Sequence, residues 1–142
     1  MTRGFTLLEL LIAISILAIL AAISAPRLAR PLDRFVVDRA ARELAAAHGR
    51  ARMRAVVESR VSLLVITPDS LVLSVLADRD TLIRWRASGP RQAGVSLTGP
   101  SRPLRFLPSG VAYGVSNATF ELSRGATTRR VVVSRWGRVR IQ

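Results

Sequence analysis

The chain has 142 residues and a formal net charge of +13, and 49% of its residues are hydrophobic. It contains no cysteine, which excludes disulfides, thiolate metal sites and cysteine nucleophiles. Residues 1–80 carry eleven arginines against eight acids, a net of +3, whereas residues 81–142 carry eleven arginines against Glu121 alone, a net of +10. We therefore expect a basic surface on the second half, with almost nothing inside that half to neutralise it.

The first element is an apolar run at residues 5–25 that contains a single charge, Glu9. As an α-helix this run is about 31 Å long, close to the hydrocarbon thickness of a bilayer. A secretory signal peptide is disfavoured by the acid and by the length of the run. A plain single-pass anchor gives no reason for Gly4 or for Glu9. An acid in such a run is costly and indicates a function.

The residues around that acid, RGFTLLE at 3–9, resemble the processing site of type IV prepilins. The resemblance implies that prepilin peptidase cleaves after Gly4, removes residues 1–4 as a leader, and leaves an N-methylated terminus at Phe5. It further implies that Glu9 sets the register of subunits by pairing with the terminal amine of a neighbour.

The same resemblance makes Pro26 the helix-kinking proline of the family and residues 5–26 the transmembrane and filament-core helix. Before assembly this helix is expected to cross the inner membrane once, with Arg3 on the cytoplasmic side. After assembly its apolar surface is expected in the core of a filament.

Beyond Pro26, apolar residues recur at steps of three and four, which predicts that the helix continues to about residue 58. Asp38 and Arg42 are spaced for an i,i+4 ion pair. His48 has no ligand partner nearby in the sequence, which favours a surface position over a site. The predicted apolar face comprises Leu28, Leu32, Phe35, Val36, Ala40, Leu44, Ala47 and Ala51.

After Arg60 the hydrophobic period changes to two, which predicts strands. In one of them Ile83, Trp85 and Ala87 are expected on a single face. The chain is thus expected to be α+β and pilin-like: a long N-terminal helix, transmembrane in its first half, packed on an antiparallel β-sheet domain. The predicted strands are 61–67, 71–77, 81–87, 95–97, 104–107, 119–122, 130–134 and 138–141.

Three C-terminal segments, FLPSG at 106–110, RRVVVS at 129–134 and GRVRI at 137–141, resemble the pattern of the GspH/FimT family of minor pilins and pseudopilins. The resemblance implies that residues 27–142 form a periplasmic pilin-like domain. No Walker or dinucleotide motif, base-activated nucleophile or metal-binding cluster is present in the sequence, and Asp78 with Asp80 is interpreted as a solvated turn. We therefore expect no enzyme, cofactor or metal.

The resemblance leaves two functions open, of which we favour the first. In the first, the chain is a minor pseudopilin of a type II secretion system, and its partners are other pseudopilins or pilins, prepilin peptidase and the inner-membrane assembly platform. The periplasmic pseudopilus that it joins supports export of folded proteins through the outer membrane.

In the second, the chain is a FimT-like minor type IV pilin that binds DNA through the GRVR segment, Gly137 to Arg140. Arg138 and Arg140 are expected to project from one face of a strand whose Val139 and Ile141 face the core. Such a face favours phosphate contacts and base stacking. The residues expected to extend it are Arg129, Arg130, Arg135 and Trp136.

Overall fold

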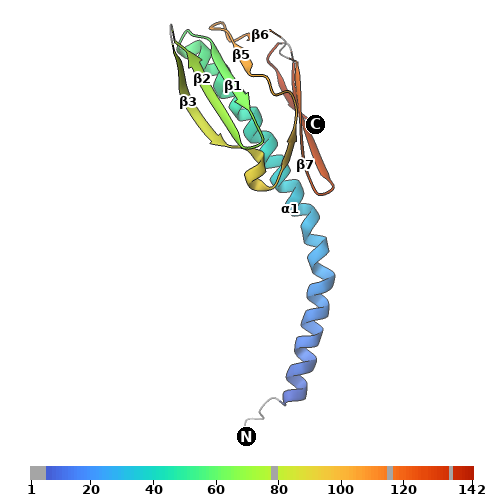
Figure 1. The fold of residues 1–142 in the computed structure, drawn as a ribbon. Coiled ribbons are helices and arrows are strands. Elements are labelled where there is room, and N and C mark those ends of the chain that lie inside the picture. Colours follow the sequence, from blue (N-terminus) through green and yellow to red (C-terminus); the bar gives the residue numbers. More distant parts are fainter. Residues whose placement is uncertain (1–5, 78–79, 115–116, 135) are drawn as a thin grey trace. The chain divides into compact units, whose positions relative to one another are not determined.

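The computed structural model describes residues 6–77, 80–114, 117–134 and 136–142, and for residues 23–29 it describes the helical backbone alone. The chain divides into two compact units, residues 1–32 and 33–142. One helix, α1 (Leu7–Val57), contributes to both (Figure 1). The predicted helix is therefore confirmed, and it ends within one residue of the expected position.

Thr6 begins α1 as its N-cap, because its Oγ1 accepts a hydrogen bond from the backbone N–H of Glu9 at 3.2 Å. Thr-x-x-Glu is the sequence pattern of a capping box, so the acid of the apolar run lies in the first turn. Within the described residues, no helix is both long and apolar enough to cross a membrane. The expected span at 5–26 includes residue 5 and the side chains of 23–26, which lie outside the described residues.

The second unit contains two antiparallel sheets. The five-stranded sheet has the order β3-β2-β1-β5-β6 and comprises β1 (Ser62–Ile66), β2 (Ser70–Leu76), β3 (Thr81–Ser88), β5 (Leu104–Phe106) and β6 (Ala112–Tyr113). The four-stranded sheet has the order β4-β7-β8-β9 and comprises β4 (Ser96–Thr98), β7 (Ala118–Arg124), β8 (Thr127–Val133) and β9 (Val139–Ile141). The predicted α+β class is confirmed.

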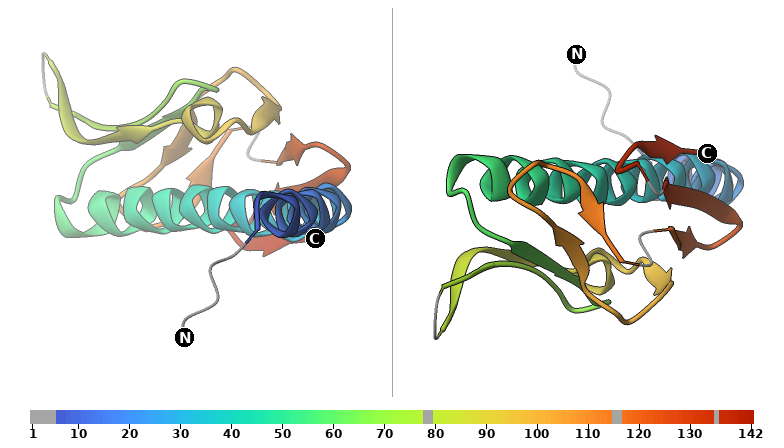
Figure 2. Two further views of the ribbon diagram at one scale, coloured as in Figure 1. Left: turned by 90° about the horizontal axis from the view of Figure 1, so that it is seen from below. Right: turned by 90° about the horizontal axis from the view of Figure 1, so that it is seen from above.

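Both sheets pack on the second half of α1 (Figure 2). A short 3₁₀ helix, η1 (Pro90–Ala93), follows β3 and was not predicted, and neither was β6. Small side chains on the buried face of α1 let the sheets approach its backbone closely. The fully buried core comprises Val37, Ala41, Leu44, Ala47, Ala51 and Ala55 of the helix with Leu64, Phe106, Phe120, Leu122 and Val131 of the strands.

The predicted apolar face of the helix is partly wrong. Leu32 and Phe35 are exposed, Phe35 by 71%, whereas Val37 is fully buried. Two residues correspond to about 200° around an α-helix, so Phe35 and Val37 point in nearly opposite directions. Repeats of three and four alone did not distinguish between the two faces.

The expected faces of β3 are also partly wrong. Trp85 pairs with Leu73 and Ala87 with Leu71, and the two share one face, as expected, which packs against the core. The register with β2 shifts between Leu73 and Ser74. A bulge of this kind inverts the alternation of side chains, and Ile83 is accordingly 58% exposed.

Candidate functional site

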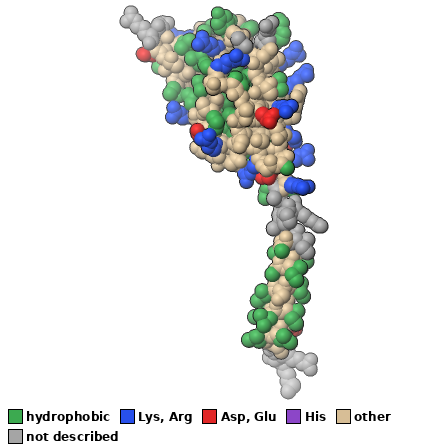
Figure 3. All heavy atoms as spheres, turned by 45° about the vertical axis from the view of Figure 1, so that its right-hand side comes forward, with side chains coloured by type: hydrophobic (Ala, Val, Ile, Leu, Met, Phe, Trp, Pro, Cys, Tyr) green, Lys and Arg blue, Asp and Glu red, His purple; other side chains and the backbone are tan. Residues whose placement is uncertain are grey.

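The described part of the first unit is a helix whose apolar side chains are exposed on every side. From Leu7 to Leu20 the large hydrophobic residues are all more than half exposed, and Figure 3 shows them covering this segment. Ser15, a polar residue within it, donates its hydroxyl to the carbonyl oxygen of Leu11 at 2.8 Å, so it needs no outside partner. A helix that is apolar all round is buried in a larger assembly or in a membrane.

Glu9 is the only described charge in this apolar stretch, and it is exposed near the helix N-terminus. The N-terminal end of the helix dipole favours a carboxylate there. Gly4 and Phe5, the expected cleavage point and mature terminus, lie outside the described residues. Pro26 lies within the helix, and its side chain also lies outside the described residues.

The second candidate site is on the outer face of β8 and β9. Val132 pairs with Arg140 across the two strands, and even-numbered residues point outward on both. They surround a shallow hollow of about 290 Å³ lined by Val132, Ser134, Trp136, Arg138, Arg140 and Gln142. Of these, only the GRVR arginines and Trp136 were predicted. The alternation with period two along the strands is the sequence signal that places Val132, Ser134 and Gln142 on the same face.

The geometry of this hollow is set by the turn between β8 and β9. Gly137 has a φ of 70°, and its N–H donates to the Ser134 carbonyl oxygen at 2.9 Å. The Ser134 hydroxyl accepts the N–H of Arg138 at 3.1 Å. These bonds place Arg138 and Arg140 on the outer face, where neither forms an ion pair with a described acid. Trp136 is 74% exposed.

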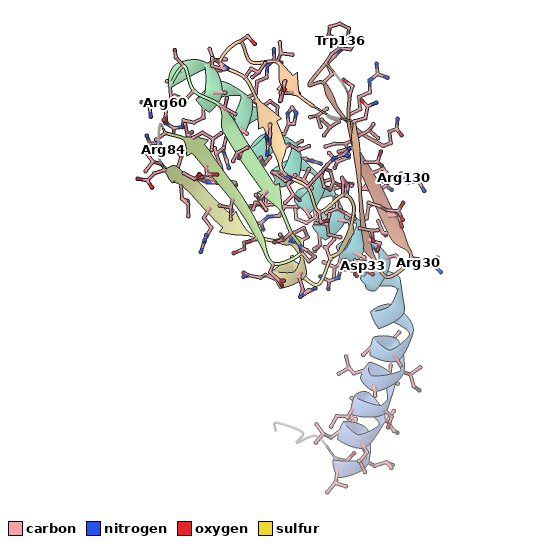
Figure 4. The ribbon with its side chains drawn as sticks, turned by 45° about the horizontal axis from the view of Figure 1, so that its top comes forward. Arg30, Asp33, Arg60, Arg84, Arg130 and Trp136 are labelled. Atoms are coloured by element: carbon pink, nitrogen blue, oxygen red, sulfur yellow. The ribbon has the colours of Figure 1, made fainter. Side chains whose placement is uncertain are left out.

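The other residues expected at this face differ in their placement. Arg130 shares it but binds Glu121 at 2.8 Å (Figure 4). Arg129 points to the other side of the sheet, where its Nε lies 2.6 Å from the Asp38 carboxylate. Arg135 lies outside the described residues. The free positive charge at the hollow, within the described chain, therefore comes from Arg138 and Arg140.

The buried side of β9 matches the expectation at Val139 and departs from it at Ile141. Val139 is half-buried and packs against the core. Ile141 pairs with the buried Val131, so it lies on the core side of the sheet. It nevertheless stays exposed, because β9 is an edge strand at the chain end and no described element covers it.

Acids of the first half neutralise several arginines of the second half, which carries Glu121 as its one acid. Asp38 pairs with Arg129 and not with Arg42, the partner expected from helix spacing. A half-buried pair between elements excludes more water than an exposed i,i+4 pair, which favours it. The other pairs that join the halves are Arg84–Glu58, Arg91–Asp69 and Arg124–Asp33.

His48 is buried, with 3% of its surface exposed, so its expected surface position is wrong. Its ring meets the Phe106 ring edge-to-face at a centroid distance of 4.9 Å, and its Nε2 has no hydrogen-bond partner among the described residues. Burial and, secondarily, the charge of Arg52 lower the pKa of His48 to about 4. The described residues contain no group of three acid, histidine or cysteine side chains that could hold a metal.

Comparison with known proteins adds two family matches. Residues 1–25 match the prokaryotic N-terminal methylation motif, and residues 40–137 match the family described as type II transport protein GspH. The pilin-like protein PilA1 of Thermus thermophilus is 31% identical over 157 aligned positions that cover 99% of this chain and 98% of that protein.

Two solved structures share the fold. The type IV minor pilin FimU of Pseudomonas aeruginosa is 23% identical, with a TM-score of 0.63 over 75% of this chain and 87% of that one. The minor pseudopilin EpsH from the type 2 secretion system of Vibrio cholerae is 15% identical, with a TM-score of 0.59 over 75% and 95%. The GspH family match covers more than half of the chain, and the methylation motif lies at the expected position, at the N-terminus. Together they show that this chain belongs to the GspH family of type IV pilin-like proteins.

Proposed function

We propose that this chain is a minor pseudopilin of a type II secretion system, a subunit of the periplasmic filament that supports export of folded proteins. The observation that carries the proposal is the first unit, an all-round apolar helix with one acid, Glu9, in its first turn. The match to type II transport protein GspH supports the choice of system. In this proposal the helix is held in the inner membrane until the subunit joins the filament.

Processing precedes assembly in this proposal. Prepilin peptidase cleaves after Gly4, and the amine of Phe5 is methylated. In the apolar filament core the Glu9 carboxylate then pairs with the terminal ammonium of a neighbouring subunit. Each charge is costly in such surroundings without its partner, so the pair selects one register of packing.

The test compares Glu9→Ala with Glu43→Ala, a matched control that removes another exposed carboxylate of α1. Both variants should keep Phe5 as the mature N-terminus by mass spectrometry. Removing one partner of a buried pair costs about 3–5 kcal/mol, so Glu9→Ala should lower filament incorporation at least about tenfold. Equal incorporation of the two variants contradicts the role of Glu9, and a mature terminus at another residue contradicts the processing.

Deleting the gene tests the choice of system. The proposal expects loss of protein secretion, restored by the intact chain and not by the Glu9→Ala variant. A deletion strain that secretes normally but no longer takes up DNA refutes the secretion role and favours the second function.

That second function is a DNA-binding minor pilin, and the hollow on β8 and β9 favours it. Arg138 and Arg140 form no ion pair with a described acid, and the exposed Trp136 lies beside them. Two guanidinium groups suit phosphates, and an exposed indole suits base stacking. Several phosphate contacts give binding that depends on salt more than on sequence.

The full chain in detergent micelles, titrated with duplex DNA at two salt concentrations, tests this function. Arg138→Ala with Arg140→Ala should weaken binding at least about tenfold and reduce the salt slope by about 1.8, the value for two lost phosphate contacts. The matched control replaces Arg86 and Arg105, exposed arginines of the other sheet without an ion pair to a described acid. If both double variants weaken binding equally, the hollow is not the site.

A further inference from the structure

A groove separates the end of α1 from the edge strand β3, on the other side of the second unit from β8 and β9. It encloses about 360 Å³, and the buried Leu73 of β2 contributes to its lining. Figure 4 shows Arg84 with Arg60 on this side, away from Trp136. The other lining side chains are Arg50, Met53, Arg54 and Val57 of α1 with Arg84 and Trp85 of β3.

The cationic side chains of the groove are held in place before any partner binds. The Arg50 guanidinium lies over the Trp85 ring, 4.7 Å from its centroid, in a cation–π contact. Arg84 donates from Nε and Nη2 to one Glu58 oxygen, at 3.1 and 2.9 Å. Arg54 reaches the other Glu58 oxygen at 3.4 Å. Ordering these long side chains beforehand lowers the entropy cost of binding.

The charge of the groove is unbalanced. Arg54 and Arg84 share the carboxylate of Glu58, and Arg50 contacts the Trp85 ring, so the groove holds three guanidinium groups against one carboxylate. The excess of two positive charges at the rim is complementary to an acidic partner. Guanidinium groups bind carboxylates in a planar, two-bonded geometry, so the rim discriminates in favour of aspartate or glutamate.

The helix wall of the groove is apolar and open to solvent. Met53 and Val57 are 63% and 68% exposed, and their spacing of four places them one above the other on α1. Single exposed apolar residues are common on any surface. Here Met53 and Val57 line the same groove as the arginines. This arrangement suits a partner that presents an apolar side chain next to a carboxylate. Nucleic acid fits less well, because the Trp85 face is already occupied by Arg50 and apolar walls do not bind phosphate.

We propose that this groove is a docking site for another subunit of the filament, which inserts an apolar side chain beside an aspartate or glutamate. The proposal rests on the proposed function, because it takes the partner to be a fellow subunit. The edge position of β3 leaves the groove accessible from the side of the sheet. The groove and the β8–β9 hollow then contact different molecules.

The test places a photo-crosslinking amino acid at position 53 of the full chain in cells that contain all subunits. The matched control places it at Tyr113, which is equally exposed but lies in β6 at the opposite edge of the same sheet. We expect an adduct from position 53 to another pilin-like subunit, identified by mass spectrometry at a peptide that contains an acid. Position 113 should give an adduct at least about tenfold weaker, as expected when one patch carries the contact.

Charge reversal provides the second arm. Arg54→Glu leaves the Arg50–Trp85 contact in place and should lower the position-53 adduct about tenfold, whereas Arg105→Glu on β5 should not. An adduct unchanged by Arg54→Glu, or formed with DNA or with a second copy of this chain alone, overturns the docking proposal. Filament incorporation of both variants is measured in parallel. If Glu9→Ala abolishes incorporation and Arg54→Glu does not, the proposed function as a subunit is retained and the docking proposal for the groove is refuted.

Discussion

The buried His48 makes the stability of the second unit sensitive to mild acid. Its ring lies against Phe106, with Nε2 buried and without a hydrogen-bond partner among the described residues. Charging the ring there requires desolvating an imidazolium beside the cationic Arg52. The folded chain therefore holds His48 neutral, whereas the unfolded chain protonates it at its ordinary pKa.

The effect of pH on the free energy of unfolding follows from the two pKa values of His48, about 4 in the folded chain and 6.5 in the unfolded chain. Between them the unfolded state binds more protons, so acid favours unfolding. The stabilisation by neutral His48 is fully present above pH 6.5 and is lost as the pH falls towards 4. The difference between the two pKa values corresponds to at most about 3.4 kcal/mol, and water reaching the ring as it charges lowers this to about 2 kcal/mol.

Thermal unfolding of the full chain in detergent, followed by circular dichroism at pH 7.5, 6.5 and 5.5, measures this effect. His48 is the single histidine of the chain, so few other groups titrate in that range. The His48→Leu variant, of similar volume and without a ring to charge, should lose most of the decrease in melting temperature. If the variant and the parent chain show the same decrease, His48 is not its source.

Three further substitutions test the packing of the second unit, each read out as a change in melting temperature of the full chain. Gly99→Ala places a Cβ 2.5 Å from Cδ1 of the buried Phe120 and should cost about 1–3 kcal/mol, whereas a neutral result would contradict the packing. Asp38→Asn breaks the half-buried pair with Arg129 and should cost about 1 kcal/mol, less at high salt; a cost independent of salt would exclude the ion pair as its origin. Gly137→Ala meets no neighbouring atom but is strained at a φ of 70°, so it should cost about 1 kcal/mol, and Gly137→Asn should cost less.

The sequence predicted the elements whose signals are local. An apolar period near 3.6 predicted α1 to within one residue of its end, and the period of two after residue 60 predicted both strands of the β1–β2 hairpin. The alternation in the GRVR segment placed Arg138 and Arg140 on one face correctly. In each case the physical cause acts over a few neighbouring residues, so one sequence contains enough information.

The features that sequence reasoning missed depend on contacts between distant segments. His48 was expected at the surface, because nothing nearby in the sequence indicates the Phe106 ring that covers it from β5. Asp38 was assigned to Arg42, and its partner Arg129 lies 91 residues away. Ile83 was placed on the wrong face by a bulge that depends on the pairing of β3 with β2. Local propensity does not encode such pairings.

The pairing of acids from the first half with arginines from the second also explains how a chain of net charge +13 forms a compact second unit. Asp33 and Asp38 of α1 bind Arg124 at the end of β7 and Arg129 on β8, so part of the repulsion between arginines becomes attraction between helix and sheet. Cationic side chains also line the β8–β9 hollow and the groove beside β3, which lie on different sides of the unit (Figure 4). A pilin-like chain with two separate cationic surfaces, one with an exposed aromatic ring and one with apolar walls, can contact two acidic partners at once. Substitutions at one surface should therefore leave binding at the other unchanged, since charges further apart than about 10 Å are largely screened at physiological salt.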